Sequence, residues 1–262
     1  LNDCLQNDPE LVTLVCEFIG YAMSNDKYWL HKALILEGEG SNGKSTLMNV
    51  IKALAGKDSY SVASLAGIKK ENTLQTLDGK LFNISSETPS KALFESSLFK
   101  ALSSGDEVNV RKLYSNTYTM KNRAKLILAC NEMPETTDYS HGLVRRLLII
   151  PFRQVFSDTN KNKDPFIEDK IMLELAGIFN KVVAAYRDVV KRKAFTKSKA
   201  SHEELETFKA VNEDFTNAWI KENLTSHPLG NGHDEHFVSI QTLYTHYSGD
   251  MDAGNIKPVD IR

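Results

Sequence analysis

A glycine-rich stretch, GEGSNGKS at residues 38–45, has the residue types and spacing of a phosphate-binding loop. Its glycines let main-chain N–H groups turn toward phosphate oxygens, and a helix beginning near Lys44 would direct its positive end at them. We expect Lys44 to reach the β- and γ-phosphates of a nucleotide and Ser45 to ligate Mg²⁺. The residues expected around the nucleotide are Gly38, Glu39, Gly40, Ser41, Asn42, Gly43, Lys44, Ser45 and Thr46.

Hydrolysis of a bound nucleotide needs further polar groups, and the sequence offers four candidates. Glu87, after the run LFNIS, is a candidate base that polarises water. Asn131, at the end of LILACN, is a candidate for orienting that water or sensing the γ-phosphate. Arg145 and Arg146, in GLVRRLLIIPF, are candidates for stabilising transition-state charge on a neighbouring subunit's nucleotide. Taken singly, each is also explained as a solvated acid, a turn asparagine or a surface ion pair.

Four short apolar runs would position these residues. KALILEG, KLFNIS, AKLILACN and RRLLIIPF are typical of buried strands, and the first three lead into the phosphate loop, Glu87 and Asn131. STLMNVIKALAG predicts a helix that ends at Gly56. Strands that alternate with helices predict an α/β fold with a mainly parallel sheet flanked by helices.

Helical periodicity predicts the remaining elements. A packing helix is expected over residues 11–22 and a long helix within 167–193. The polar stretch FTKSKASHEELE predicts a linker, followed by a helix from Phe208. We expect an N-terminal helical segment (1–31), a core (32–155), a helical subdomain (156–195), and a linker with a small, truncated helical or winged-helix module (196–262). The lack of a starting methionine and of a closing element suggests a fragment.

Composition and charge limit the classes of protein that fit. The chain of 262 residues has 41% hydrophobic residues and a net charge of -2, so bulk charge does not attract polyanions and any nucleic-acid site must be local. Two basic stretches, 108–131 and 187–199, are the places for one. There is no run of about 20 apolar residues and no signal peptide, which predicts a cytoplasmic protein without membrane contact, in the host-cell cytoplasm if it is viral.

Cysteine and histidine usage gives no sign of a structural metal. Cys4, Cys16 and Cys130 lie far apart in the sequence, so neither a disulfide framework nor a zinc site is predicted. The cluster SHPLGNGHDEH contains His227, His233, Asp234 and His236, but its spacing fits no standard ligand pattern. It is interpreted as a surface loop.

The order and spacing of these motifs resemble those of the superfamily 3 helicases, most closely the phage, plasmid and poxvirus-type primase-helicases. The resemblance runs from EGEGSNGKSTL through LFNISSET, LFKALSSGDEVNVRKLY and LILACNEMP to GLVRRLLIIPF, over roughly residues 5–155. It implies an AAA+ P-loop NTPase core, ATP and Mg²⁺ as cofactors, and a homo-hexameric ring around a nucleic-acid strand. Lys44 and Ser45 would belong to Walker A, Glu87 to Walker B, Asn131 to sensor 1, and Arg146, with Arg145 as the second candidate, to the arginine finger.

One position departs from the family pattern. Many members place two acids together at Walker B, whereas this chain has Ser86 followed by Glu87. Ser45 and Glu87 are the candidate metal-ligating residues, but Mg²⁺ could instead rely on Ser45, phosphates and water. Glu87 would keep the role of activating water.

The stretch VNVRKLYSNTYTMK predicts a β-hairpin, because alternating residues flank a polar SNT turn. It resembles the family's hairpin, which projects into the ring channel and grips single-stranded DNA. Arg111, Lys112 and Lys121 would neutralise phosphates, and Tyr114 or Tyr118 would stack on a base. The alternative is a solvated edge hairpin with its tyrosines packed inward. Lys100 and Asp106 also match the family motif, without a separate role.

The sequence therefore predicts an ATP-dependent replicative DNA helicase of a mobile element or virus, acting on single-stranded or forked DNA. The resemblance also implies a primase or primase-polymerase domain N-terminal to this region in the parent chain. The alternative is a nonhydrolysing ATP-dependent DNA clamp or initiator module. A guanine-nucleotide switch is disfavoured because NKxD is absent, and a small-molecule kinase because no basic lid is found.

Overall fold

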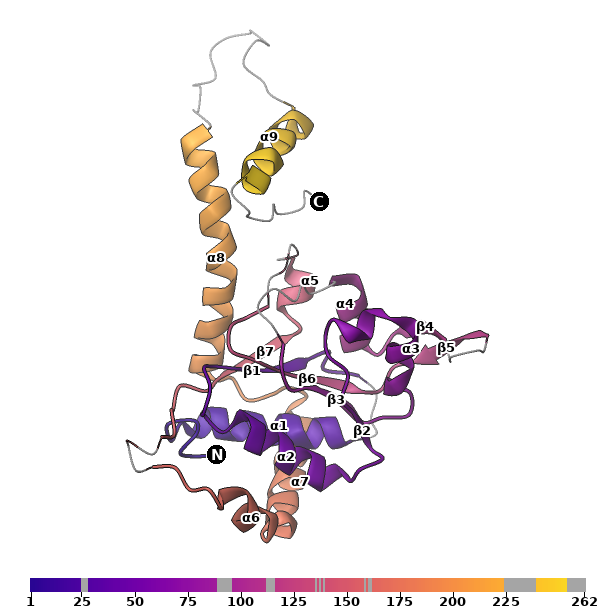
Figure 1. Ribbon diagram of the computed structural model, residues 1–262, viewed down its shortest axis with the longest axis vertical. Coiled ribbons are helices and arrows are strands. Elements are labelled where there is room, and N and C mark those ends of the chain that lie inside the picture. Colours follow the sequence, from indigo (N-terminus) through magenta and orange to yellow (C-terminus); the bar gives the residue numbers. More distant parts are fainter. Residues whose placement is uncertain are drawn as a thin grey trace.

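A five-stranded parallel sheet flanked by helices forms the centre of the computed structural model (Figure 1). The structure describes residues 1–24, 28–88, 96–111, 116–134, 136, 138, 140–157, 159, 162–223 and 239–253. The elements are α1 (Pro9–Met23), β1 (Ala33–Glu37), α2 (Lys44–Ala55), β2 (Tyr60–Ser61), η1 (Gly67–Lys69), α3 (Glu71–Leu74), η2 (Gln75–Leu77), β3 (Phe82–Ser85), α4 (Ser96–Ser104), β4 (Glu107–Arg111), β5 (Thr117–Lys121), β6 (Lys125–Cys130), α5 (His141–Val144), β7 (Leu147–Pro151), α6 (Ile167–Met172), α7 (Leu175–Arg192), α8 (Lys199–Asn223) and α9 (Ile240–Ala253).

The sheet has the strand order β2-β3-β6-β1-β7, and every neighbouring pair is parallel. The four predicted strands are confirmed as β1, β3, β6 and β7. Strand β1 lies between β6 and β7, so the chain moves to one side of β1 after α2 and adds β7 on the other. Ligands of open parallel sheets bind at such a switch point, outside the carboxyl ends of the strands.

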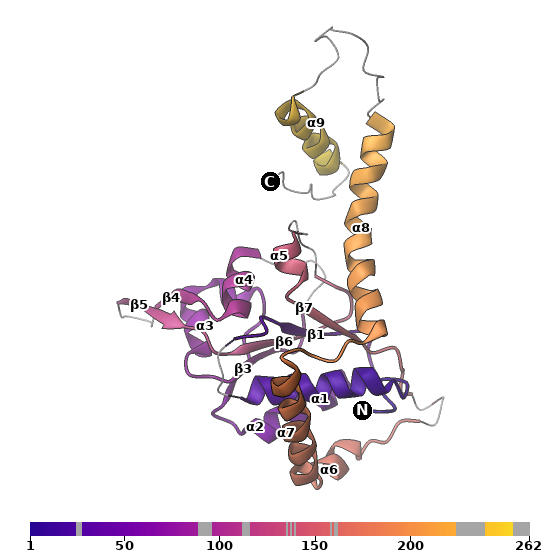
Figure 2. The ribbon, with the colours of Figure 1, turned by 180° about the vertical axis from the view of Figure 1, so that it is seen from behind.

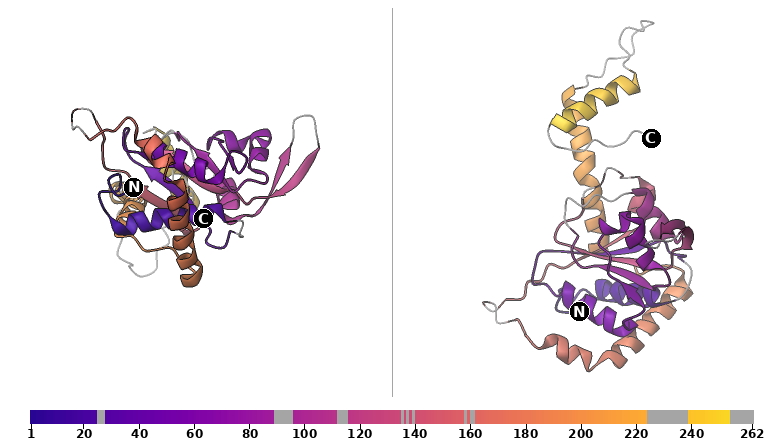
Figure 3. Two further views of the ribbon diagram at one scale, coloured as in Figure 1. Left: turned by 90° about the horizontal axis from the view of Figure 1, so that it is seen from below. Right: turned by 45° about the vertical axis from the view of Figure 1, so that its right-hand side comes forward.

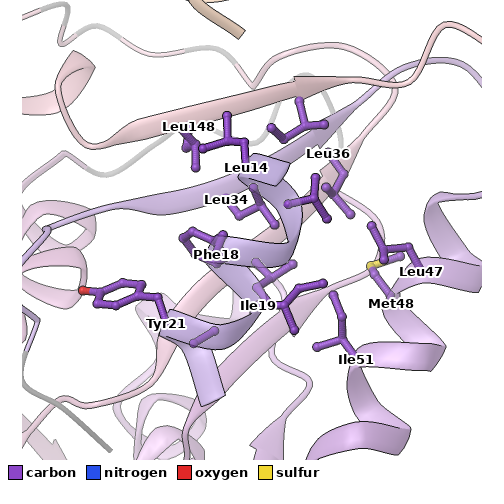
Figure 4. Close-up of a cluster of buried hydrophobic side chains, with 14 of the residues drawn as sticks. Leu14, Phe18, Ile19, Tyr21, Leu34, Leu36, Leu47, Met48, Ile51 and Leu148 are labelled. Atoms are coloured by element: carbon purple, nitrogen blue, oxygen red, sulfur yellow. The ribbon is translucent and has the colours of Figure 1, made fainter. Parts of the chain in front are cut away.

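Helices α1, α2 and α7 cover one face of the sheet (Figures 1 and 2). Figure 4 shows how side chains of α1 and α2 meet those of β1 and β7 in a cluster of buried, mainly apolar side chains. At Gly20 of α1, a Cβ would lie 2.6 Å from the Cβ of Tyr186, so glycine allows α1 and α7 to approach closely. The labelled residues are Leu14, Phe18, Ile19, Tyr21, Leu34, Leu36, Leu47, Met48, Ile51 and Leu148.

The other face of the sheet packs against α4, the hairpin of β4 and β5, and the first turns of α8. Phe99 of α4, Val110 of β4, Met120 of β5 and Phe208 of α8 are all buried there. The hairpin predicted from the sequence is confirmed, and Figure 3 shows its strands extending outward from the body of the sheet. The hairpin is therefore anchored to the core by one buried apolar residue on each strand, Val110 on β4 and Met120 on β5.

Helix α1 begins with a capping aspartate and a proline in its first turn, both of which are typical of helix N-termini. Asp8 is the N-cap and accepts hydrogen bonds from the main-chain N–H groups of Glu10 (2.8 Å) and Leu11 (3.0 Å), and Pro9 occupies the first helical turn. The packing helix predicted over 11–22 is thus confirmed. Helix α1 buries its apolar side chains against the sheet of the core.

The region after β7 differs from the expectation in two ways. The long helix expected within 167–193 is two helices, α6 and α7, separated at residues 173–174. The expected linker is wrong for most of its length, because α8 begins at Lys199 and packs against β7 through Leu205 and Phe208. Its later turns extend away from the sheet (Figures 1 and 2). None of the described helices is both long and apolar enough to cross a membrane.

Candidate functional site

The phosphate loop, residues 38–45, leaves the carboxyl end of β1 and enters α2. Gly38 has φ 148°, Ser41 φ 57° and Gly43 φ 91°, so the main chain reverses direction within six residues. Gly43 is also the N-cap of α2 in the left-handed conformation, which glycine adopts without the steric cost of a Cβ. The loop therefore has the form that presents main-chain N–H groups and a helix N-terminus to an anion.

Neighbouring segments hold this loop in place. The Asn42 side chain, 2% exposed, donates hydrogen bonds to the main-chain oxygens of Glu39 and Phe152, the latter at 3.1 Å. A Cβ at Gly38 would collide with that same oxygen of Phe152. The main-chain N–H of Phe156 donates to the oxygen of Ser41 at 2.7 Å. The loop shape thus depends on the segment after β7 as well as on its own glycines.

Lys44 points back over the loop. Its ammonium donates to the main-chain oxygens of Gly38 and Glu39, the latter at 2.9 Å, and to Oδ1 of Asn42 at 3.1 Å. Burial lowers the pKa of Lys44, and the charge of Glu37 opposes that shift. Ser45 is exposed in the first turn of α2, and Thr46 is half-buried beside it. The cation is therefore centred where the loop would receive a phosphate group.

Lys44, Glu87 and Asn131 line one cleft of about 520 Å³, the carboxyl-edge cleft. Glu87 follows β3 and Asn131 follows β6, the neighbouring strand, which itself pairs with β1. Both side chains are exposed to solvent. The structure thus brings together three residues that lie far apart in the sequence. The lining residues are Lys44, Ser86, Glu87, Thr88, Ala129, Cys130, Asn131 and Glu132.

Three residues of this edge were not predicted from the sequence. Glu132 lines the cleft directly after Asn131, and its signal in the sequence is the same, a polar residue just past a buried strand. Thr88 is buried, with its hydroxyl 3.2 Å from that of Ser85 and its N–H donating to Ala129. Burial raises the pKa of Cys130 to about 12, so its thiol stays protonated and is no nucleophile at neutral pH.

An ion-pair chain runs from β1 to α8 beside the loop. The guanidinium of Arg153 lies 2.6 Å from Oε2 of Glu37, the last residue of β1, and 2.6 Å from Oε1 of Glu204 in α8. Burial raises the pKa of Glu37, and the charge of Arg153 opposes that rise. This contact fastens the first turns of α8 to the strand that carries the phosphate loop, and no sequence motif pointed to it.

The two candidate arginines lie at the amino ends of the parallel strands, whereas the phosphate loop lies at their carboxyl ends. They precede β7, whose first residue, Leu147, pairs with Ala33 at the start of β1. Arg146 is only 9% exposed and donates to the Ser104 hydroxyl (2.7 and 3.2 Å) and to the main-chain oxygen of Gly142. Arg145 is exposed. Packing therefore turns one arginine inward and leaves the other at the surface.

The hairpin has one polar face and one apolar face. The register pairs Glu107 with Lys121 and Arg111 with Thr117, and these side chains share the exposed face. Tyr118 is on the other face. It is half-buried against the apolar cluster between the hairpin, α4 and the sheet, and its hydroxyl donates to Asp78 at 2.9 Å. The alternative of an inward-packed tyrosine therefore describes the position of Tyr118. Lys112 and Tyr114 lie outside the described residues.

Lys100, which matches the family motif without a separate role, forms an ion pair with the buried Asp138 and donates to the Ser140 hydroxyl at 3.1 Å. Ser140 is the N-cap of α5, the helix that leads into the arginine pair. Lys100 thus positions that helix. The main-chain oxygen of Asp106 accepts a hydrogen bond from the main-chain N–H of Asn122 at the base of the hairpin.

Within the described part of the chain, no group of three or more His, Cys, Asp or Glu side chains is arranged to hold a metal ion. The cluster of His227, His233, Asp234 and His236 lies outside the described residues. Mg²⁺ commonly uses one or two protein oxygens together with phosphate oxygens and water. Ser45, Glu87 and Glu132 supply such oxygens near the loop, so the residues present fit that ion.

Sequence comparisons relate this chain to parts of longer proteins. Residues 36–146 match the model of a family described as "Family of unknown function (DUF5906)". Over 163 residues, 56% of this chain, the sequence is 27% identical to "Putative helicase L207/L206" of Acanthamoeba polyphaga mimivirus. The match spans 15% of the length of that viral protein.

Solved structures share the fold. "The A form apo structure of NrS-1 C terminal region-CTR" aligns with a TM-score of 0.60 at 15% identity, covering 86% of this chain and 57% of that one. A second form of the same region, residues 305–718, aligns with a TM-score of 0.55 at 14% identity over the same shares. This likeness confirms the α/β architecture with its parallel sheet.

Proposed function

We propose that this chain is the motor region of an ATP-dependent replicative DNA helicase of a mobile element or virus, with the AAA+ core of superfamily 3. The observation that carries the proposal is the convergence of Lys44, Glu87 and Asn131 on one cleft beside the phosphate loop. The name of the mimivirus relative, a helicase, supports the same class.

Binding of ATP follows from the loop. Main-chain N–H groups of the loop and the N-terminus of α2 would receive the phosphate oxygens, because the helix dipole and the unpaired N–H groups favour negative charge there. Lys44 would exchange the three oxygen acceptors that it now contacts for oxygens of the β- and γ-phosphates. Its ammonium then offsets charge that grows on the transferred group.

Hydrolysis would use the two groups at the strand ends. Glu87 accepts a proton from the attacking water, and Asn131 orients that water through its amide. Both side chains are exposed to the cleft, where a water molecule can reach them. When bound, Mg²⁺ supplies charge neutralisation on the phosphate oxygens, and Ser45 with a carboxylate of the cleft would hold it.

The transition state would be completed by a second copy of the chain. Strand β1 has five residues, about 17 Å at 3.3 Å per residue, and the arginine pair lies at the end away from its own phosphate loop. Such an arginine cannot reach the nucleotide of its own chain, so we propose that it acts on that of a neighbour. A head-to-tail interface forms a ring when its rotation closes, and by the family resemblance we propose a homo-hexamer. Arg145, the exposed member, is the residue that we assign to this role.

Single-stranded or forked DNA would bind along the polar face of the hairpin, where Arg111 and Lys121 are exposed. Each hydrolysis event would then move the hairpin and the strand that it holds. In the parent protein, a primase or primase-polymerase domain would precede this region. The small share of the mimivirus protein that the match spans leaves room for further domains there.

The proposal is tested by measuring steady-state ATP hydrolysis with and without single-stranded DNA. The Lys44→Ala variant, which lacks the proposed phosphate-binding lysine, gives the background rate. We expect turnover that DNA stimulates and that disappears in the variant. A ring that binds ATP and DNA without turnover would instead support a nonhydrolysing clamp or initiator. Ser86, a neutral residue in the cleft before Glu87, is the observation that keeps this second candidate open.

A further inference from the structure

The carboxyl-edge cleft contains two carboxylates among its lining residues, Glu87 and Glu132. The proposed reaction asks carboxylates for two different tasks, to activate water and to help hold Mg²⁺. A carboxylate bound to a divalent cation is a poor base, because the cation stabilises its ionised form and lowers its pKa. Two tasks therefore call for two groups.

The position of Glu132 suits the metal task. It follows β6, and β6 lies between β3, which leads to Glu87, and β1, which leads to the phosphate loop. Its side chain is exposed, so it can be approached by a hydrated cation. Glu132 thus leaves the sheet between the proposed base and the phosphates.

The other acidic residues near the loop are less suited. Glu37 is half-buried and its carboxylate is already paired with Arg153 at 2.6 Å. Glu39 is exposed on the loop itself but does not line the cleft. Ser86 lines the cleft but carries only a neutral hydroxyl.

We propose that Glu132 is the carboxylate that holds the divalent cation of the nucleotide, directly or through the cation's water shell, and that Glu87 is left as the base. The inference rests on the proposed function, since it needs a bound nucleotide. It replaces the expected assignment of Glu87 to the metal. Mg²⁺ keeps several of its waters and commonly uses one or two carboxylates with substrate phosphates, which matches this arrangement.

The test separates nucleotide binding from cation binding. A fluorescent ATP analogue is titrated into the chain in EDTA, and Mg²⁺ is then titrated in to find its half-saturating concentration; Mn²⁺ binding by electron paramagnetic resonance gives a second readout. For Glu132→Gln we expect unchanged affinity in EDTA, within about twofold, and a half-saturating Mg²⁺ concentration about 10- to 100-fold higher. Glu87→Gln should leave the Mg²⁺ requirement unchanged and lower turnover by about 10²- to 10⁴-fold.

Glu203→Gln, at an exposed position of α8 away from the cleft, is the matched control and should change neither quantity. An Mg²⁺ requirement in Glu132→Gln that moves no more than in this control would overturn the inference alone. So would a shift in Glu87→Gln with none in Glu132→Gln. Failure of the unchanged chain to bind ATP at all would overturn the proposed function and, with it, the inference.

Discussion

The side-chain amide of Asn42 donates a hydrogen bond to the main-chain oxygen of Phe152, 3.1 Å away, and so joins the phosphate loop to the end of the neighbouring strand β7. The same side chain donates to the oxygen of Glu39 and accepts from the Lys44 ammonium at 3.1 Å. One buried amide therefore fixes the loop, the strand end and the cation together. The shape of the phosphate loop is therefore fixed by hydrogen bonds to neighbouring segments.

Asn42→Ala removes these hydrogen bonds and leaves the oxygen of Phe152 without its side-chain donor. We expect the free energy of unfolding to fall by about 1–3 kcal/mol, since buried polar groups are left unsatisfied. ATP affinity should fall as well, because the loop loses the hydrogen bonds that join Asn42 to Glu39 and to the end of β7. Urea unfolding and ATP titration measure both effects. Asn72→Ala, at an exposed position of α3, should stay within about 0.5 kcal/mol of the unchanged chain, and an equal loss in both variants would contradict the role of Asn42.

The two adjacent arginines should respond differently to removal. Arg146→Ala deletes a buried guanidinium bonded to Ser104 and to the main chain at Gly142, so we expect a loss of about 1–3 kcal/mol in the free energy of unfolding. Arg145→Ala should leave stability within about 0.5 kcal/mol and ATP binding intact, while turnover falls by about 10³- to 10⁵-fold. Urea unfolding and steady-state hydrolysis distinguish the two.

A mixing experiment tests whether Arg145 acts on a neighbour. Chains with Lys44→Ala keep Arg145, and chains with Arg145→Ala keep Lys44, so a mixed ring contains interfaces with both groups intact. We expect turnover to reappear when the two inactive variants are mixed. Turnover that stays absent in rings shown to be mixed would exclude the trans role.

The hairpin should bind DNA through its polar face only. Arg111→Ala or Lys121→Ala should weaken binding to single-stranded DNA of any sequence and reduce the slope of log K against log salt by about 0.7 for each phosphate that is no longer neutralised. Affinity for ATP should not change. Fluorescence anisotropy at several salt concentrations measures the slope, and a slope that stays the same in both variants would place the DNA elsewhere.

Tyr118→Leu is the companion variant, because it removes the ring and keeps an apolar side chain against the core. Since the hydroxyl of Tyr118 is bound to Asp78 and the ring lies on the core side, we expect DNA affinity within about twofold. A base stacked on this ring would be worth about 1–3 kcal/mol, so a loss of that size would show that Tyr118 leaves its position to bind DNA.

Stability should fall as the solution becomes mildly acidic, through His31. Burial lowers the pKa of His31, and the charges of Arg146 and Arg145 lower it further, with Asp106 opposing them. The unfolded chain therefore binds a proton at His31 more readily than the folded chain does. The stabilisation from His31 is fully present above the unfolded pKa of about 6.5, and it is lost as the pH falls from that value toward the lower folded pKa.

His31→Asn removes this titration, and asparagine tolerates the left-handed φ of 50° at this position. We expect the free energy of unfolding of the variant to change less between about pH 7.5 and about pH 5.5 than that of the unchanged chain. Urea unfolding at both pH values measures the difference. An equal fall in both proteins would assign the acid sensitivity to other groups.

Local patterns in the sequence were enough to predict β1, α2 and their connecting loop, because the apolar run, the glycines and the helix signals follow one another directly along the chain. The same holds for α1, for the hairpin and for strands β3 and β6, which lead to Glu87 and Asn131. Parallel strands place their carboxyl ends at one edge, so the meeting of these residues near Lys44 also followed from the strand assignments.

Only the tertiary structure decided which side chains of these elements are buried and which are exposed to a ligand or a partner. Arg145 and Arg146 are adjacent in sequence, and the family resemblance favoured Arg146. Hydrogen bonds to Gly142, one helical turn earlier, and to Ser104, 42 residues earlier, bury Arg146 and leave Arg145 exposed. The polar stretch before Phe208 is helical because Leu205 and Phe208 find an apolar surface on the sheet. Glu132 becomes significant because β6 lies between β3 and β1. Strand order and burial arise from contacts between distant segments, which the pattern of neighbouring residues does not encode.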